Sequence, residues 1–153
     1  MRRKEKEIKD VKEMESIIQG SRVCRLAMCE KDSPYVVPLC FGYRNKTLYF
    51  HTAVEGMKMD ILKKNNRVCF ECDLDHEVVT SPNPCEWGMK YRSVIGFGRA
   101  TFVEDRERKE KALDIILEHS GAKGPFSYSE KGFKKIMIIK VDIESMTGKK
   151  AGY

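Results

Sequence analysis

The sequence predicts a mainly β protein with peripheral helices (α+β), folded as a six-stranded antiparallel β-barrel in one domain over residues 1–153. Six segments are enriched in β-branched and aromatic residues or alternate with the period of a strand. Several of them are separated by little more than turns, and parallel strands would need longer crossover connections. No internal repeat and no change of composition marks a second domain.

The first half of the chain begins with an amphipathic helix over residues 7–19, followed by Gly20 as a stop signal. Strands are expected over residues 22–29, 35–43 and 47–52, with turns at 30–34 and 44–46. A loop over residues 53–56 leads into a short helix over 57–65, whose buried face carries Ile61 and Leu62.

The second half contains strands over residues 68–73, 91–103 and 136–142. Gly96 and Gly98 indicate a bulge or sharp bend within the second of these strands. Asp105 is expected to cap a helix over residues 106–119, which turns Ala112, Leu113, Ile116 and Leu117 inward. Residues 74–90 and 121–134 show no clear period and are interpreted as loops.

Charge and hydropathy exclude several classes of protein. The net charge of +6 is spread along the chain rather than gathered on one element, so no nucleic-acid partner is predicted. The positive charge favours small molecules that carry phosphate. No apolar run approaches the roughly 20 residues that span a bilayer, and the N-terminus lacks the apolar stretch of a signal peptide. We therefore expect a cytoplasmic protein without a membrane partner.

The six cysteines lie mostly in strand-like segments, where a free cysteine behaves as a small hydrophobic residue. Cys69 and Cys72 are three residues apart on a strand, so their side chains point to opposite faces and cannot chelate a metal together. His76 lies among acidic residues that we interpret as solvated charge. No metal site is predicted.

The clearest chemical signal is a lysine, Lys58, in the first turn of the helix that follows the third strand. Unpaired amides at a helix start, together with a cationic side chain, form a site for an anion such as phosphate. The alternative is a lysine that points into water. Spacing excludes a P-loop.

Two further segments carry weaker signals. Pro38 interrupts the ladder of its strand and indicates an edge, where free backbone groups could face a planar polar ring. Alternation along the strand 91–103 separates Tyr91 and Ser93 from Arg92 and Val94, and Arg92 could meet a phosphate or carboxylate. An ordinary edge strand and a solvated arginine explain the same residues.

Taken together, these segments resemble the pyridoxamine-phosphate-oxidase-like split barrel, and more narrowly its nitroimidazole-resistance (Nim) branch of flavin-binding proteins. The matching runs are residues 35–43, 48–58, 68–71, 91–100 and 103–105, in order and with similar gaps. The vitamin branch of this family uses an arginine-rich phosphate cluster and C-terminal substrate residues. Here the matching loop has one lysine and residues 146–150 read Met-Thr-Gly-Lys-Lys, so the resemblance favours flavin binding over oxidation of pyridoxamine phosphate.

The resemblance implies an FMN-binding homodimer that holds the flavin near the subunit interface and acts on a small-molecule substrate. The residues it assigns to the flavin are Val37, Pro38, Leu39 and Cys40 along the ring, His51, Thr52, Ala53 and Lys58 near the ribityl chain and phosphate, and Arg92 and Ser93 from the same or the partner subunit. His51 is the one candidate for a catalytic role, the alternative being binding or packing.

The expected activity is that of a reductase or oxidase, with reduction of a nitro group as the reaction that the resemblance suggests. In such proteins the cofactor carries the electrons, while the protein orients it and tunes its electrostatics. A non-catalytic flavin-binding or sensing module and a haem-binding protein on the same barrel are the alternatives.

Overall fold

One antiparallel sheet organises residues 3–153, the part of the chain that the computed structural model describes. Its strands follow the order β3-β2-β6-β7-β8-β5-β4, and β1 pairs with β8 beside this path. The strands are β1 (Glu7–Ile8), β2 (Cys24–Glu30), β3 (Ser33–Leu39), β4 (Gly42–Arg44), β5 (Thr47–Ala53), β6 (Arg67–Val79), β7 (Gly88–Val103) and β8 (Ile136–Ala151). The prediction of a mainly β, antiparallel fold with peripheral helices is confirmed.

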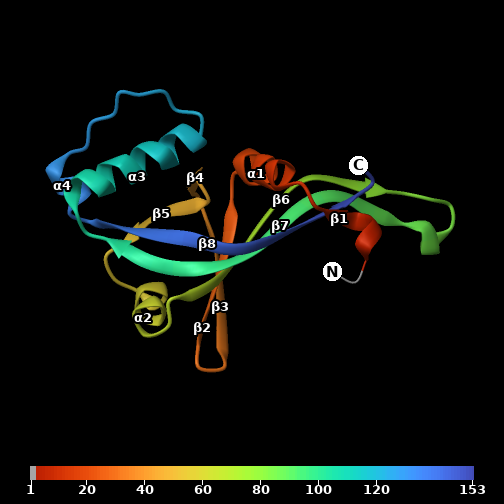
Figure 1. Cartoon of the computed structure of the whole chain (residues 1–153), viewed down its shortest axis with the longest axis horizontal. Coiled ribbons are helices and arrows are strands. Elements are labelled where there is room, and N and C mark those ends of the chain that lie inside the picture. The colour runs from red at the N-terminus through yellow and green to blue at the C-terminus, as the bar shows by residue number, and fades with distance from the viewer. Residues whose placement is uncertain (1–2) are drawn as a thin grey trace.

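The helices cover the sheet from several sides (Figure 1). They are α1 (Val11–Gly20), α2 (Met57–Lys64), α3 (Arg106–His119) and α4 (Glu130–Phe133), with short 3-10 turns η1 (Lys4–Lys6) and η2 (Pro84–Glu86). Helix α3 packs on β4 and β5, whereas α2 packs on β2 on the other side of the molecule. None of the helices in residues 3–153 is both long and apolar enough to cross a membrane.

The strand count is eight rather than the six predicted. Residues 7–8, expected to start the first helix, form β1 against the far end of β8, and Val11 at the start of α1 is exposed. The strand predicted over residues 35–43 is divided, because the chain leaves β2 after Leu39 and pairs with β5 from Gly42 onward. The hairpin turn at 44–46 is confirmed, with the positive φ of Asn45 and Lys46 that a tight two-residue hairpin needs.

The predicted loop over residues 74–90 was wrong in large part. Strand β6 continues to Val79 and β7 begins at Gly88, so the two strands form a long ribbon. Between Leu74 and Glu77 the register shifts, and Asp75 takes a positive φ. An extra residue in a strand moves all following side chains to the opposite face. The alternation therefore changes phase there, which hid the strand in the sequence.

The buried side chains and the cap of α3 agree for the most part with the sequence predictions. Large side chains fill the barrel between its strands, including Phe41, Phe50 and Phe70, and a second cluster lies beneath α3. The carboxylate of Asp105 accepts a hydrogen bond from the backbone N–H of Arg108 at 2.9 Å, which confirms the predicted cap of α3. Leu117 is half-buried, and Ile115 takes the fully buried place on that helix.

Cys72 is fully buried and Cys69 is half-buried, as the alternation of β6 predicts. The neighbouring Cys24 thiol and burial raise the pKa of Cys72 well above its usual range. The buried thiol is therefore held in its protonated, unreactive form.

Candidate functional site

Strand β3 forms one end of the sheet and pairs only with β2 among residues 3–153. Its outer side therefore presents backbone groups that no other strand uses, as the position of Pro38 predicts. Val37 and Leu39 point into the barrel and pack against the core, whereas Pro38 and Cys40 are exposed. A planar ring laid along this edge would meet backbone groups of the strand.

The last residues of β5 have no strand paired on the side of β4. Strand β4 pairs with β5 only as far as Tyr49, while β8 continues to pair with it to Ala53. Gly42 pairs with Tyr49, and Cys40 lies in the two-residue connection between β3 and β4 that precedes this pair. That segments 37–40 and 51–53, which the resemblance assigns to one site, meet there stays a prediction. His51 and Ala53 are exposed and Thr52 is buried.

Helix α2 begins directly after this strand end, and its first turn lacks a side-chain cap. Gly56 occupies the N-cap position with φ of +123° and has no side chain that could accept a hydrogen bond. Asp10 and Asp105 perform this task for α1 and α3. The first amides of α2 are therefore available to an external acceptor, and the helix dipole favours a negatively charged one.

Lys58 is half-buried in this turn and makes no ion pair with any residue of the described part of the chain. Lys64 at the other end of α2, by contrast, pairs with Glu30 at 2.5 Å. The hydroxyl of Thr52 is buried and has no hydrogen-bond partner within residues 3–153. A buried hydroxyl without a partner costs roughly 1–3 kcal/mol, so a bound group that supplies one would be stabilising.

Arg92 and Ser93 lie far from this cluster within one chain. His51 pairs with Ile138 of β8, whereas Arg92 pairs with Lys150, twelve residues further along the same strand. At a rise of about 3.3 Å per residue, this separation along β8 is up to about 40 Å. One subunit does not bring the two groups together.

The side chains of these two residues also point to different faces of β7. Arg92 lies 3.4 Å from the carboxylate of Asp75 and stacks on the ring of Tyr153, with its Nε buried and unpartnered in the described chain. Ser93 lies on the opposite face with Ile95 and Phe97. The alternation predicted for this strand is confirmed, whereas a role of either residue in a ligand site stays a prediction.

The outer face of β7 carries a row of apolar side chains that the sequence reasoning missed. The outer face of β7 is the face that carries every second residue of the strand, namely Met89, Tyr91, Ser93, Ile95 and Phe97. Phe97 is 52% exposed and Ile95 is 44% exposed. The sequence does carry a signal for this face. Val94, Gly96 and Gly98 are small or apolar and fill the inward positions, so the large apolar residues Ile95 and Phe97 between them must point outward.

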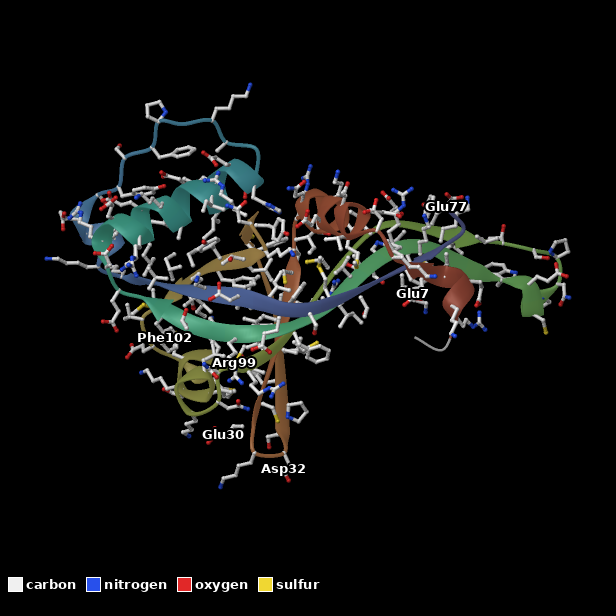
Figure 2. The ribbon with its side chains drawn as sticks, viewed as in Figure 1. Glu7, Glu30, Asp32, Glu77, Arg99 and Phe102 are labelled. Atoms are coloured by element: carbon white, nitrogen blue, oxygen red, sulfur yellow. The ribbon has the colours of Figure 1, made fainter. Side chains whose placement is uncertain are left out.

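Two hollows lie between the helices and the strands. One of about 460 Å³ lies between α2 and the β2–β3 hairpin and is lined by residues that include Tyr35, Met57 and Ile61. A second, of about 520 Å³, lies between α3 and the sheet and includes Tyr49, Phe102 and Lys140. Figure 2 shows Glu30 and Asp32 at the tip of the hairpin that borders the first hollow.

Residues 10–150, nearly the whole chain, match the family described as pyridoxamine 5'-phosphate oxidase. The chain belongs to this family. A crystal structure of a protein from Bacteroides thetaiotaomicron VPI-5482, named for resistance to 5-nitroimidazole antibiotics, is 40% identical with a TM-score of 0.83. The alignment covers 94% of this chain and 85% of that one. The predicted membership of the pyridoxamine 5'-phosphate oxidase-like split-barrel family is confirmed.

One more distant solved structure shares the fold, and one curated relative matches part of the sequence. An FAD and haem binding protein from Mycobacterium smegmatis has a TM-score of 0.83 at 15% identity, over 97% of this chain and 74% of that one. Among curated proteins, an uncharacterized protein of Rhizobium meliloti (strain 1021) is 29% identical over 59 residues. That match covers 39% of this chain and 38% of the relative.

Proposed function

We propose that this chain is a cytoplasmic flavoprotein that binds FMN and uses it as a reductase or oxidase of small molecules. The observation that carries the proposal is the start of α2. Within one short segment it combines uncapped amides with Lys58 and the hydroxyl of Thr52, neither of which has a polar partner among residues 3–153. Such a set of donors suits the phosphate of FMN. The family membership supports the same assignment.

The residues of this site fit a flavin mononucleotide in two parts. The phosphate would lie against the first turn of α2 and Lys58, with Thr52 on the ribityl side. The ring would lie along the exposed edge of β3 from Val37 to Leu39 and along Cys40 just after it, where backbone groups are free for its polar atoms. When bound, FMN supplies the transfer of electrons between donor and substrate. The protein binds and orients it, and His51 on the exposed face of β5 is the candidate proton donor.

The register of β7 supports the proposal of a homodimer with the flavin at its interface. Arg92 is near one end of this strand, and Val103 at the other end pairs with Ile138, the partner of His51. Phe97, an exposed apolar residue, lies midway between Arg92 and Val103. In a twofold contact centred on Phe97, the segment of one subunit around Arg92 and Ser93 lies opposite the His51 end of the other. The exposed outer face of β7 supplies the apolar surface for this contact.

Binding of FMN is tested on the purified protein. We expect a yellow protein, or one that becomes yellow on incubation with FMN, with the visible absorption of a bound flavin. FAD titrated in parallel should bind more weakly, because the proposed site ends at the first phosphate. A protein that stays colourless with both flavins would sink the proposal, and a Soret band in the same spectrum would favour the haem alternative.

Catalysis is tested separately from binding. Rapid mixing of the FMN-loaded protein with NADH or NADPH should bleach the flavin, and a nitroimidazole or another acceptor should restore its colour. Bound FMN that no donor reduces would favour a non-catalytic flavin-binding or sensing module.

Thr52→Val should separate stability from binding at this site. The substitution removes a buried hydroxyl that has no partner in the described part of the chain, so the protein without flavin should unfold at the same or slightly higher urea concentration. If the hydroxyl serves the flavin, the affinity for FMN falls by about tenfold, equivalent to one hydrogen bond of roughly 1–1.5 kcal/mol. Fluorescence titration with FMN and urea unfolding measure the two effects.

Thr47→Val on the same strand is the matched control. Its hydroxyl lies 3.4 Å from the carbonyl oxygen of Asn45 and 3.3 Å from the carboxylate of Asp142. This variant should lose roughly 1 kcal/mol of stability and keep its affinity for FMN. Equal FMN affinities for the two variants would remove Thr52 from the site.

A further inference from the structure

The ribbon formed by β6 and β7 extends beyond the rest of the sheet as a two-stranded arm, which we define as residues 75–90. Within it, Glu77 pairs with Lys90, Val78 with Met89 and Val79 with Gly88. Figure 1 shows the arm leaving the body on the side away from α2, α3 and β5. Figure 2 places Glu77 on this side, and Arg99 and Phe102 of the same sheet on the other.

The tip of the arm is an ordered structure around Trp87. The indole N–H donates a hydrogen bond to the carbonyl oxygen of Ser81 at 2.7 Å, and the hydroxyl of Ser81 donates to Glu86 at 2.7 Å. Asn83 caps η2 through the backbone N–H of Cys85. The polar atom of Trp87 is thus satisfied within the tip, while the side chain remains 56% exposed.

An exposed tryptophan held in this way is typical of an interface. Val78 and Met89, a cross-strand pair on the same ribbon, are also about half exposed. A two-stranded ribbon is marginally stable in water without a surface to pack on, and tryptophan is enriched among the residues that dominate binding energy at interfaces. These observations indicate that the arm packs on another surface.

That surface does not belong to the flavin site of the same chain. The arm continues β7 beyond Arg92, which already lies up to about 40 Å along β8 from the level of His51. Met89 belongs to the outer face of β7, so the apolar row of the sheet continues onto the arm. A second copy of the chain that packs on this face also reaches the arm.

The twofold contact centred on Phe97 determines where the arm meets that second copy. Tyr91 of one subunit lies opposite Val103 of the other, at the level of His51, and the arm begins immediately beyond. We propose that the arm of each subunit lies over the flavin site of its partner, and that Trp87 forms an aromatic wall on the substrate side of that site. This inference rests on the proposed flavin site and dimer.

The chain offers a direct probe, because Trp87 is its only tryptophan. Energy transfer from an indole to a flavin falls steeply with distance. If the arm of the partner covers the flavin, saturation with FMN should remove most of the Trp87 emission of the wild-type dimer. Bound FMN, seen by its own visible absorption, together with unchanged Trp87 emission would overturn the arm proposal and leave the proposed function intact. Absence of FMN binding would instead contradict the proposed function.

Heterodimers decide which subunit provides the arm. One chain carries Lys58→Ala, which weakens its own flavin site and keeps Trp87, and the other carries Trp87→Phe, which keeps its flavin site and lacks the indole. The mixed dimer is purified through two different affinity tags, and FMN is added at a concentration that saturates only the intact site. We expect most of the Trp87 emission to be lost in the heterodimer and retained in the Lys58→Ala homodimer. Emission retained in the heterodimer, or a wild-type chain that stays monomeric, would overturn the proposal.

Discussion

Replacing Gly98 by alanine is expected to lower the free energy of unfolding by roughly 3 kcal/mol, at the upper end of what overpacking costs. A Cβ at this position would lie 2.3 Å from the carbonyl oxygen of Asp142 and 3.1 Å from the side chain of Val141. The oxygen belongs to the backbone of β8 at the bulge where its register with β7 shifts, so it cannot move without disturbing the ladder. The melting temperature should fall by about 6–12 °C.

Gly88→Ala is the matched control in the same strand. A Cβ at Gly88 meets no atom within 4 Å, so this variant should unfold within about 0.5 kcal/mol of the wild type. Urea unfolding followed by far-ultraviolet circular dichroism measures both variants. Equal midpoints would contradict the close approach of β7 and β8 at Gly98.

Lys58→Ala is expected to weaken FMN binding by roughly 10- to 150-fold. A hydrogen bond to a charged group is worth about 1.5–3 kcal/mol, and Lys58 has no ion-pair partner in residues 3–153 that would compete with a phosphate. Because its amine forms no ion pair within the described residues, the variant should retain the stability of the wild type in the absence of FMN. Fluorescence titration with FMN gives the dissociation constants.

Lys64→Ala tests whether the effect belongs to the site or to the charge of α2. Lys64 is on the same helix but pairs with Glu30, and such exposed pairs contribute little. Its loss should change FMN affinity by less than about twofold, since screening weakens charges more than a Debye length of roughly 8–10 Å apart. Equal dissociation constants for the two lysine variants would remove the phosphate assignment at α2.

Some residues of the candidate site can be identified from their neighbours in the sequence, and others cannot. Lys58 was identified because a cationic side chain beside the unpaired amides of a helix start can bind an anion, and the structure adds that this turn has no side-chain cap. Pro38 indicated an edge strand, and β3 is one. Thr52 entered only through the family resemblance, because a missing hydrogen-bond partner is invisible until the packing around the hydroxyl is known.

The errors have a common physical cause in the pairing of distant strands. The arm was interpreted as a loop because the bulge after Leu74 reverses the alternation of β6, and only β7 shows that pairing resumes at Glu77. Likewise, β8 was expected to end at residue 142, but pairing with β7 and β1 extends it to Ala151. Local propensity does not encode a register that two separate segments define together.

The sequence alone determined the class of the fold, the edge at Pro38, the cap at Asp105, the hairpin turn at Asn45 and the cation at the start of α2. Each of these depends on a few neighbouring residues, through backbone dihedral preferences and local hydrogen bonds. Only the tertiary structure decided that His51 and Arg92 pair with residues near opposite ends of β8. That separation results from the register of β5, β7 and β8, which depends on side chains that meet across the whole barrel.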